Sequence, residues 1–317
     1  MSRIAVLGAG AFGTALALVL ARAGREVVLW GRDAEAMIAS RRSPRLPEVP
    51  VPAALRLTGD LAETDDASVV LLAVPAQALA GFLALHSSRL DGRVLIACCK
   101  GVDRDSGLGP SGLIRRFCPA AVPALISGPG FAADLAAGLP TAMTLAIADP
   151  RDTEIQAQLS GANLRLYLSA DLVGVEAGGA VKNVVAIACG IVVGAGFGES
   201  ARAALLTRGY AEMVRYAMRL GASERTLAGL SGLGDLVLTA TSAKSRNYGH
   251  GVAIGRGETP AEGVTVEGVA TCRALAQLAR TEALDLPLTV TLAAVLDGAL
   301  SVSEAMRELL SRPLKSE

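Results

Sequence analysis

The sequence predicts an α/β fold: a Rossmann-like, doubly wound, mostly parallel sheet followed by an all-α C-terminal domain. In the first half of the chain, short apolar runs alternate with segments of helical periodicity, which is typical of parallel sheets covered by helices. After Asp171 the strand-like runs stop and helical periodicity prevails. We therefore expect an NAD(P)-binding sheet domain over residues 1–172 and a helical substrate-binding and catalytic domain over residues 173–317.

The runs ASVVLLAVP, GRVLIACCKG and ALISGPG are apolar and closed by turn residues, as expected for strands buried on both faces of a parallel sheet. The expected strands lie in RIAVLGAG, EVVLWG, ASVVLLAVP, GRVLIACCKG, ALISGPG, TAMTLAIA and NLRLYLS. The proline-rich connection RRSPRLPEVPVP cannot form a regular helix. In the second half we expect helices over about 173–195, 200–220, 223–231, 266–281, 288–297 and 301–310.

Composition and charge exclude several classes of function. The 317 residues include 30 Lys and Arg and 30 Asp and Glu, so no net charge draws the chain to nucleic acid or to a membrane surface. Five cysteines without a C-x-x-C pair, and only two histidines, are poor material for a metal site. Without a leader pattern or an apolar run long enough to span a bilayer, we expect a cytoplasmic protein with no membrane span and no metal.

The sequence GAGAFG places Gly8, Gly10 and Gly13 in G-x-G-x-x-G spacing between an apolar strand and a helix. In that context the spacing predicts dinucleotide binding, because the glycines allow a tight turn and close approach to the pyrophosphate. The second strand ends at WGR, where an NAD site usually has an acidic residue. Arg32 favours the 2′-phosphate of NADPH, and Asp33, one position later, keeps NADH possible.

The stretch GGAVKNVVAIACGIVVGAG, residues 178–196, places Lys182 and Asn183 in an apolar helix. Burial disfavours a charged lysine and lowers its pKa, so Lys182 is either a strained structural accident or a group that moves a proton. Lys100 ends a buried strand, at the sheet edge where α/β folds bind ligands. The run Ser245–Arg246–Asn247 combines a hydroxyl, a guanidinium and an amide, which suit a phosphate.

These features belong to an ordered series of motifs. They are GAGAFGTAL, WGR, Lys100–Gly101, SGPGFA, AVKN, TRGYAEM, GLGDL, SRN and VEG. With them the chain strongly resembles the soluble bacterial NAD(P)-dependent sn-glycerol-3-phosphate dehydrogenases. The resemblance implies the reversible NAD(P)H-dependent reduction of dihydroxyacetone phosphate to sn-glycerol 3-phosphate, a supply of this product to glycerophospholipid synthesis, and a homodimer.

The resemblance also implies a role for each matched residue, with Lys182 as the acid and base. The implied catalytic residues are Lys182, Asn183, Asp235, Thr239 and Lys100. The implied substrate contacts are Lys100, Gly128, Gly130, Lys182, Asp235, Ser245, Arg246 and Asn247. The implied cofactor contacts are Gly8, Gly10, Ala11, Phe12, Gly13, Arg32, Lys100, Ala132, Arg246, Thr265 and Glu267.

Departures from the family pattern, among them the following two, leave alternatives open. Gly130 stands where the family usually has Ser, and GESA (198–201) where it usually has G-x-N-A. One alternative is a related β-hydroxyacid or ketopantoate-type reductase, which the Ser–Arg–Asn run and the strand-end Lys100–Gly101 disfavour. The other is a catalytically inactive nucleotide-binding homologue, which the intact Lys182 and Asp235 disfavour, because buried charges are costly to keep without use.

Overall fold

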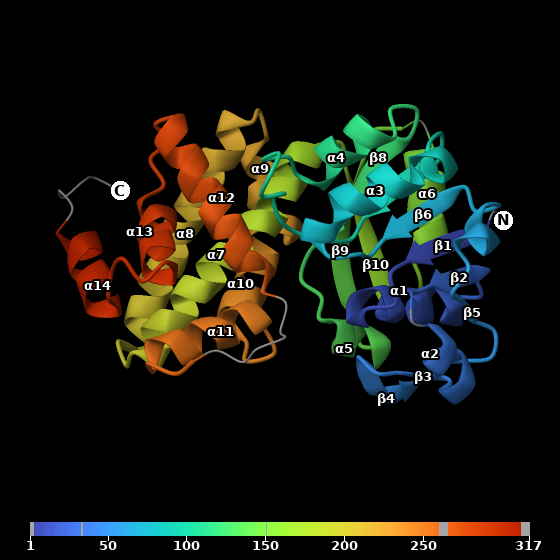
Figure 1. Cartoon of the computed structure of the whole chain (residues 1–317), viewed down its shortest axis with the longest axis horizontal. Helices are drawn as coiled ribbons and strands as arrows, with labels where there is room; N and C mark the ends of the chain where they lie inside the picture. The colour runs from blue at the N-terminus through green and yellow to red at the C-terminus, as the bar shows by residue number, and fades with distance from the viewer. Residues whose placement is uncertain (1–2, 33, 150, 260–265, 312–317) are drawn as a thin grey trace.

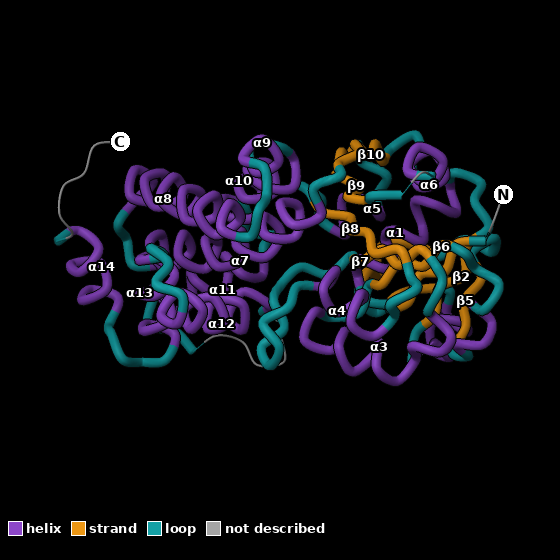
Figure 2. The backbone as a smooth tube through the Cα atoms, turned by 90° about the horizontal axis from the view of Figure 1, so that it is seen from above, coloured by secondary structure: helices purple, strands orange, loops and turns teal. Residues whose placement is uncertain are grey.

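The computed structural model describes residues 3–32, 34–149, 151–259 and 266–311. One half of the molecule is built on a single large sheet with helices around it, and the other half contains helices only (Figures 1 and 2). The predicted fold class, a mostly parallel Rossmann-like sheet followed by a helical C-terminal part, is therefore confirmed.

The sheet half contains β1 (Ile4–Leu7), α1 (Ala11–Arg22), β2 (Val27–Trp30), α2 (Ala34–Ser40), β3 (Arg42–Ser43), β4 (Leu46–Pro50), β5 (Arg56–Thr58), the 3-10 helix η1 (Leu61–Thr64), β6 (Val69–Leu72), α3 (Ala76–Leu90), β7 (Val94–Ala97), α4 (Pro110–Phe117), β8 (Val122–Ser127), α5 (Ala132–Ala136), β9 (Thr141–Ile147), α6 (Asp152–Leu159) and β10 (Leu164–Ser169). The helical half contains α7 (Leu172–Gly194), α8 (Gly198–Arg219), α9 (Glu224–Leu227), the π-helical turn η2 (Leu230–Gly234), α10 (Asp235–Thr241), α11 (Arg246–Gly255), α12 (Glu267–Thr281), α13 (Pro287–Leu296) and α14 (Val302–Leu310).

The large sheet has eight strands in the order β10-β9-β8-β7-β6-β1-β2-β5. Its pairs are parallel except β8 with β9, so β9 and β10 run against the rest. Leu7 pairs with both Trp30 and Leu72. The carboxyl ends of β1, β2 and β6 therefore lie side by side, at the edge where open α/β sheets bind ligands.

Side chains that alternate along the strands fill two cores. Ile4 and Val6 of β1 pack with α1 and α5 on one face, and Ala5 and Leu7 pack with α3 and α4 on the other. Burial of both faces explains why β1, β2, β6 and β7 are continuous apolar runs. Strand β5 and the hairpin β3–β4, which occupies the proline-rich connection, were not predicted as strands.

Helix α7 is the centre of the helical half and packs against α8, α10, α11 and α12. It is long and apolar enough to cross a membrane, and the only such helix among the described residues, but 89% of its most apolar window is buried inside the protein. Gly190 of α7 and Gly251 of α11 let the two backbones touch, because a Cβ on Gly190 would lie 2.1 Å from the carbonyl oxygen of Tyr248. The sequence prediction missed α10 and α11, whose segment is rich in Gly, Ser and Thr.

Candidate active site

The G-x-G-x-x-G segment forms the turn from β1 into α1. Gly8 has φ +121°, and a Cβ there would lie 2.6 Å from the carbonyl oxygen of Ala73. A Cβ on Gly13 would lie 2.0 Å from the carbonyl oxygen of Gly8, whereas one on Gly10 would meet nothing within 4 Å. Helix α1 starts at Ala11 and Phe12 with no side-chain cap and no acidic residue in its first turn. Open space before a helix N-terminus with uncapped N–H groups fits the pyrophosphate of a dinucleotide.

Lys182 is held by two oxygen atoms of α10. Its ammonium donates to Asp235 Oδ1 at 2.6 Å and to Thr239 Oγ1 at 2.9 Å, and Thr239 Oγ1 donates to Asp235 Oδ1 at 3.2 Å. Lys182, Asp235 and Thr239 are all buried. Because Asp235 and Thr239 are four residues apart on one helix, they share a face and meet the same ammonium.

Lys100 approaches the same carboxylate from the sheet half. Its ammonium lies 2.5 Å from Asp235 Oδ2 and donates to the carbonyl oxygen of Gly128 at 3.1 Å. Asp235 is therefore shared by two ammonium groups, one from each half of the molecule. We call Lys100, Lys182, Asp235 and Thr239 the lysine–aspartate cluster.

The charges of this cluster set the pKa of Lys182. Burial lowers the pKa of Lys182 to about 8, Asp235 opposes that shift, and the nearby Lys100 adds to it. Burial acts to raise the pKa of Asp235, but the ammonium groups of Lys100 and Lys182 outweigh it and the pKa falls below its usual value. Lys182 can therefore lose and regain a proton near neutral pH while Asp235 stays ionised.

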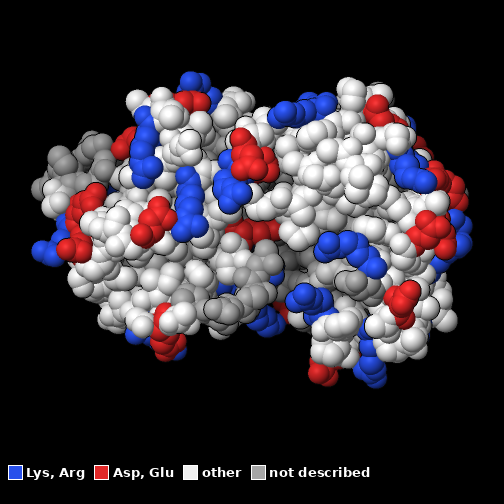
Figure 3. Space-filling model, viewed as in Figure 1, with Lys and Arg blue, Asp and Glu red and all other residues white. Residues whose placement is uncertain are grey.

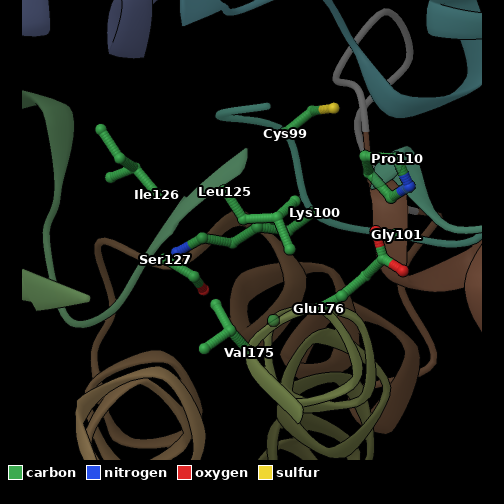
Figure 4. A pocket seen from close by; sticks show the side chains of 10 residues that line it. Cys99, Lys100, Gly101, Pro110, Leu125, Ile126, Ser127, Val175 and Glu176 are labelled. Carbon is green, nitrogen blue, oxygen red and sulfur yellow. The ribbon is translucent and has the colours of Figure 1, made fainter. Parts of the chain in front are cut away.

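A small pocket lies behind Lys100, and the sequence prediction missed two polar residues in it. Figure 4 shows the Lys100 side chain crossing the pocket and ending beside Ser127, with the Glu176 carboxylate pointing toward Pro110. Ser127 Oγ is buried without a hydrogen-bond partner among the described residues. Glu176 accepts from the backbone N–H of Ser111 at 2.6 Å at the start of α4. The only sequence signal for Glu176 was an acidic residue in an apolar helix.

The run Ser245–Arg246–Asn247 lies at the start of α11. Ser245 is the N-cap and accepts from the backbone N–H of Tyr248 at 3.2 Å. Arg246 is exposed and Asn247 is half-buried. A helix N-terminus followed by an arginine suits a phosphate group.

The other predicted site residues occupy several elements. Gly128 and Gly130 follow β8, and Ala132 begins α5. Asn183 lies next to Lys182 on α7, and its side-chain oxygen accepts from Asn247 Nδ2 at 3.0 Å. Glu267 begins α12 and accepts from the backbone N–H of Ala76 at 3.4 Å.

Arg32 is exposed in the turn after β2. Thr265 and Asp33 lie outside the described residues. Figure 3 shows a hollow between the two halves, with Lys and Arg side chains on its rim at the sheet side. Within the described ranges, no group of three or more His, Cys, Asp or Glu residues could hold a metal ion.

Comparison with known proteins assigns the family. Residues 3–153 match the NAD-dependent glycerol-3-phosphate dehydrogenase N-terminus, and residues 171–307 match the C-terminus of the same family. The chain belongs to the NAD-dependent glycerol-3-phosphate dehydrogenase family. The resemblance stated from the sequence motifs is thereby confirmed.

Individual members of the glycerol-3-phosphate dehydrogenase family are similar over the whole chain. The glycerol-3-phosphate dehydrogenase [NAD(P)+] of Paracoccus denitrificans is 53% identical over 315 residues, covering 99% of each chain. That of Cereibacter sphaeroides is 54% identical, covering 99% of this chain and 100% of its own. The crystal structure of the Coxiella burnetii glycerol-3-phosphate dehydrogenase superposes with a TM-score of 0.93 at 38% identity, covering 98% of this chain and 99% of its own.

Proposed function

We propose that this protein reduces dihydroxyacetone phosphate to sn-glycerol 3-phosphate with NAD(P)H, and catalyses the reverse reaction. The observation that carries the proposal is the buried lysine–aspartate cluster, which joins the ligand-binding edge of the sheet to the helical half. In this proposal residues 1–172 bind the cofactor, and residues 173–317 bind the substrate and supply Lys182.

When bound, the reduced nicotinamide supplies the hydride to the substrate carbonyl carbon. The Lys182 ammonium has three N–H groups, of which Asp235 and Thr239 accept two. The third N–H is left to donate its proton to the carbonyl oxygen. The resulting neutral amine keeps two N–H groups for Asp235 and Thr239, and its lone pair takes the hydroxyl proton in the reverse reaction.

The charge of the cluster favours this transfer. With both lysines protonated and Asp235 ionised, the buried cluster carries one net positive charge, and proton transfer from Lys182 removes it. A buried site of low polarity disfavours net charge, which is why the pKa of Lys182 falls to about 8. Asp235 also binds Lys100 at one oxygen and Lys182 at the other, which in this proposal places both ammonium groups beside one substrate.

The substrate phosphate is assigned to Ser245, Arg246 and the free backbone N–H groups that begin α11. Gly128 and Gly130 would approach the substrate from the sheet half, where Lys100 bonds to both Gly128 and Asp235. On the cofactor side, Gly8, Gly10, Ala11, Phe12 and Gly13 would hold the pyrophosphate, with Ala132, Arg246, Thr265 and Glu267 as further contacts. Arg32 favours NADPH over NADH, because a guanidinium pairs with the 2′-phosphate. A cytoplasmic homodimer that supplies glycerophospholipid synthesis completes the proposal.

A two-by-two turnover assay tests the function. Purified protein is mixed with dihydroxyacetone phosphate and either NADPH or NADH, and the loss of reduced-nicotinamide absorbance is followed. Turnover that disappears in Lys182→Ala supports the reaction and the proton donor. If the wild type binds cofactor but turns over nothing, the reaction is wrong, and ketopantoate and β-keto acids are the substrates to test next.

A further inference from the structure

The side chain of Asn247 connects three helices. Its Nδ2 donates to Asn183 Oδ1 on α7 at 3.0 Å, and its Oδ1 accepts from the backbone N–H of Gly268 on α12 at 3.0 Å. Asn247 itself lies at the start of α11. An amide that donates to one helix and accepts from another holds both at fixed distances from its own helix.

Gly268 is required for this contact. A Cβ on Gly268 would lie 2.7 Å from Asn247 Oδ1 and 2.7 Å from the carbonyl oxygen of Asn183. Real Cβ atoms do not approach oxygen so closely, so any side chain would push the start of α12 away from α7 and α11. We call Asn183, Asn247 and Gly268 the amide brace.

The first turn of α12 touches the sheet half on its other side. Glu267 Oε1 accepts from the backbone N–H of Ala76, which starts α3. A Cβ on Gly101, just after β7, would lie 3.2 Å from Thr271 Oγ1. The turn that leads into α3 also packs on Gly8, because Ala73 O would be 2.6 Å from a Cβ there. The start of α12 therefore lies between the amide brace and the edge that carries the dinucleotide turn.

We propose that Asn247 is a positioning residue for the cofactor site, acting through the amide brace on Glu267 and the start of α12. This inference rests on the proposed function for the location of the two sites. Two of the hydrogen-bonding groups of the Asn247 amide are already used within the protein. Asn247 then binds the substrate phosphate through its backbone N–H at the start of α11. Its side chain fixes the position at which α12 contacts the cofactor.

Binding of NADPH without any substrate tests this role. The dissociation constant is measured by the fluorescence of bound NADPH for the wild type, Asn247→Ala and Asn183→Ala. Each variant is expected to bind NADPH about three- to tenfold more weakly, because each breaks the hydrogen bond between Asn247 and Asn183. The double variant is expected to bind NADPH no more weakly than Asn247→Ala alone, because Asn183→Ala breaks a bond that Asn247→Ala already breaks. Since no substrate is present, failure of the proposed reaction leaves the result interpretable.

A glycine pair tests the brace without touching its amides. Gly268→Ala is expected to weaken NADPH binding at least as much as Asn247→Ala. Gly249→Ala is the matched control, because Gly249 also lies on α11 and a Cβ there meets nothing within 4 Å. If Asn247→Ala does not fold, Asn247→Asp keeps the acceptor for Gly268 and loses the donor toward Asn183. The proposal is overturned if NADPH binding is unchanged in Gly268→Ala and in the folded Asn247 variant while the KM for dihydroxyacetone phosphate is raised. Asn247 is then a phosphate ligand only.

Discussion

Lys182 Nζ lies 2.6 Å from Asp235 Oδ1, although the two residues are 53 positions apart in the chain. The other oxygen of the same carboxylate holds Lys100. One buried aspartate thus orients two ammonium groups and keeps the pKa of Lys182 from falling below about 8. With a pKa of about 8, the buried Lys182 can exchange its proton near neutral pH, as a catalytic acid or base must.

Lys182→Ala is expected to lower kcat in both directions by a factor of about 10² to 10⁴, the usual contribution of a positioned acid or base. NADPH binding measured without substrate should change little, because the hydrogen-bond partners of the Lys182 ammonium, Asp235 and Thr239, both lie on α10 in the helical half. The measurement is steady-state kinetics beside a fluorescence titration. A kcat within threefold of the wild type would exclude Lys182 as the proton donor.

The pH profiles of the two directions should be mirror images. Reduction needs the Lys182 ammonium, so its kcat should be level below pH about 8 and fall above it. Oxidation needs the neutral amine, so its kcat should rise with pH and become level above about 8. Asp235→Asn removes the group that raises the pKa of Lys182, so both midpoints should move to lower pH, whereas Lys100→Met should move them higher. Midpoints that stay in place in both variants would contradict the assignment.

Arg32→Ala is expected to reduce kcat/KM for NADPH about tenfold, because one charge-assisted hydrogen bond at an exposed position is lost. The value for NADH should stay within about twofold, since NADH has no 2′-phosphate. The measurement is the ratio of kcat/KM with NADPH to kcat/KM with NADH, with the same series of substrate concentrations used for both cofactors. An equal loss for both cofactors would mean that Arg32 does not recognise the 2′-phosphate.

Gly130→Ser introduces the residue that the family resemblance implies at this position. A Cβ there would lie 3.2 Å from Thr141 Cγ2 and 3.4 Å from Met143 Sδ, so a small side chain fits with little movement. We expect KM for dihydroxyacetone phosphate to fall about threefold through one added hydrogen bond. Gly130→Ala adds the same Cβ without the hydroxyl and should not lower KM. A fall in both variants would point to backbone stiffening instead.

Glu212→Ala is expected to lower the free energy of unfolding by about 3 kcal/mol. The buried Glu212 carboxylate accepts from Thr289 Oγ1 at 2.7 Å and from the backbone N–H groups of Leu288 and Thr289 at 2.5 and 3.0 Å, at the start of α13. Denaturant titration followed by circular dichroism measures the loss. Glu304→Ala, which removes an exposed capping carboxylate from α14, should cost clearly less. Equal losses of unfolding free energy in the two variants would show that the burial of Glu212 adds nothing to stability.

Much of the site could be predicted because its signals are local. The dinucleotide turn needs glycines at set positions between a strand and a helix, and all of them lie within six residues of Gly8. Lys182 was visible because a charge stands out in an apolar helix. The helices α10 and α11 were missed, because their Gly, Ser, Thr and Asn residues have low intrinsic helix propensity. These segments are helical because they pack on α7.

The sequence by itself determined the fold class, the family and the chemical character of Lys182, since periodicity, glycine spacing and residue type are properties of neighbouring positions. Only the tertiary structure decided that Asp235 is shared by Lys100 and Lys182, and that Asn247 joins Asn183 to Gly268. These contacts join residues from distant parts of the chain. Their geometry depends on how α7, α10, α11 and α12 pack on one another and on the sheet, which no local pattern specifies.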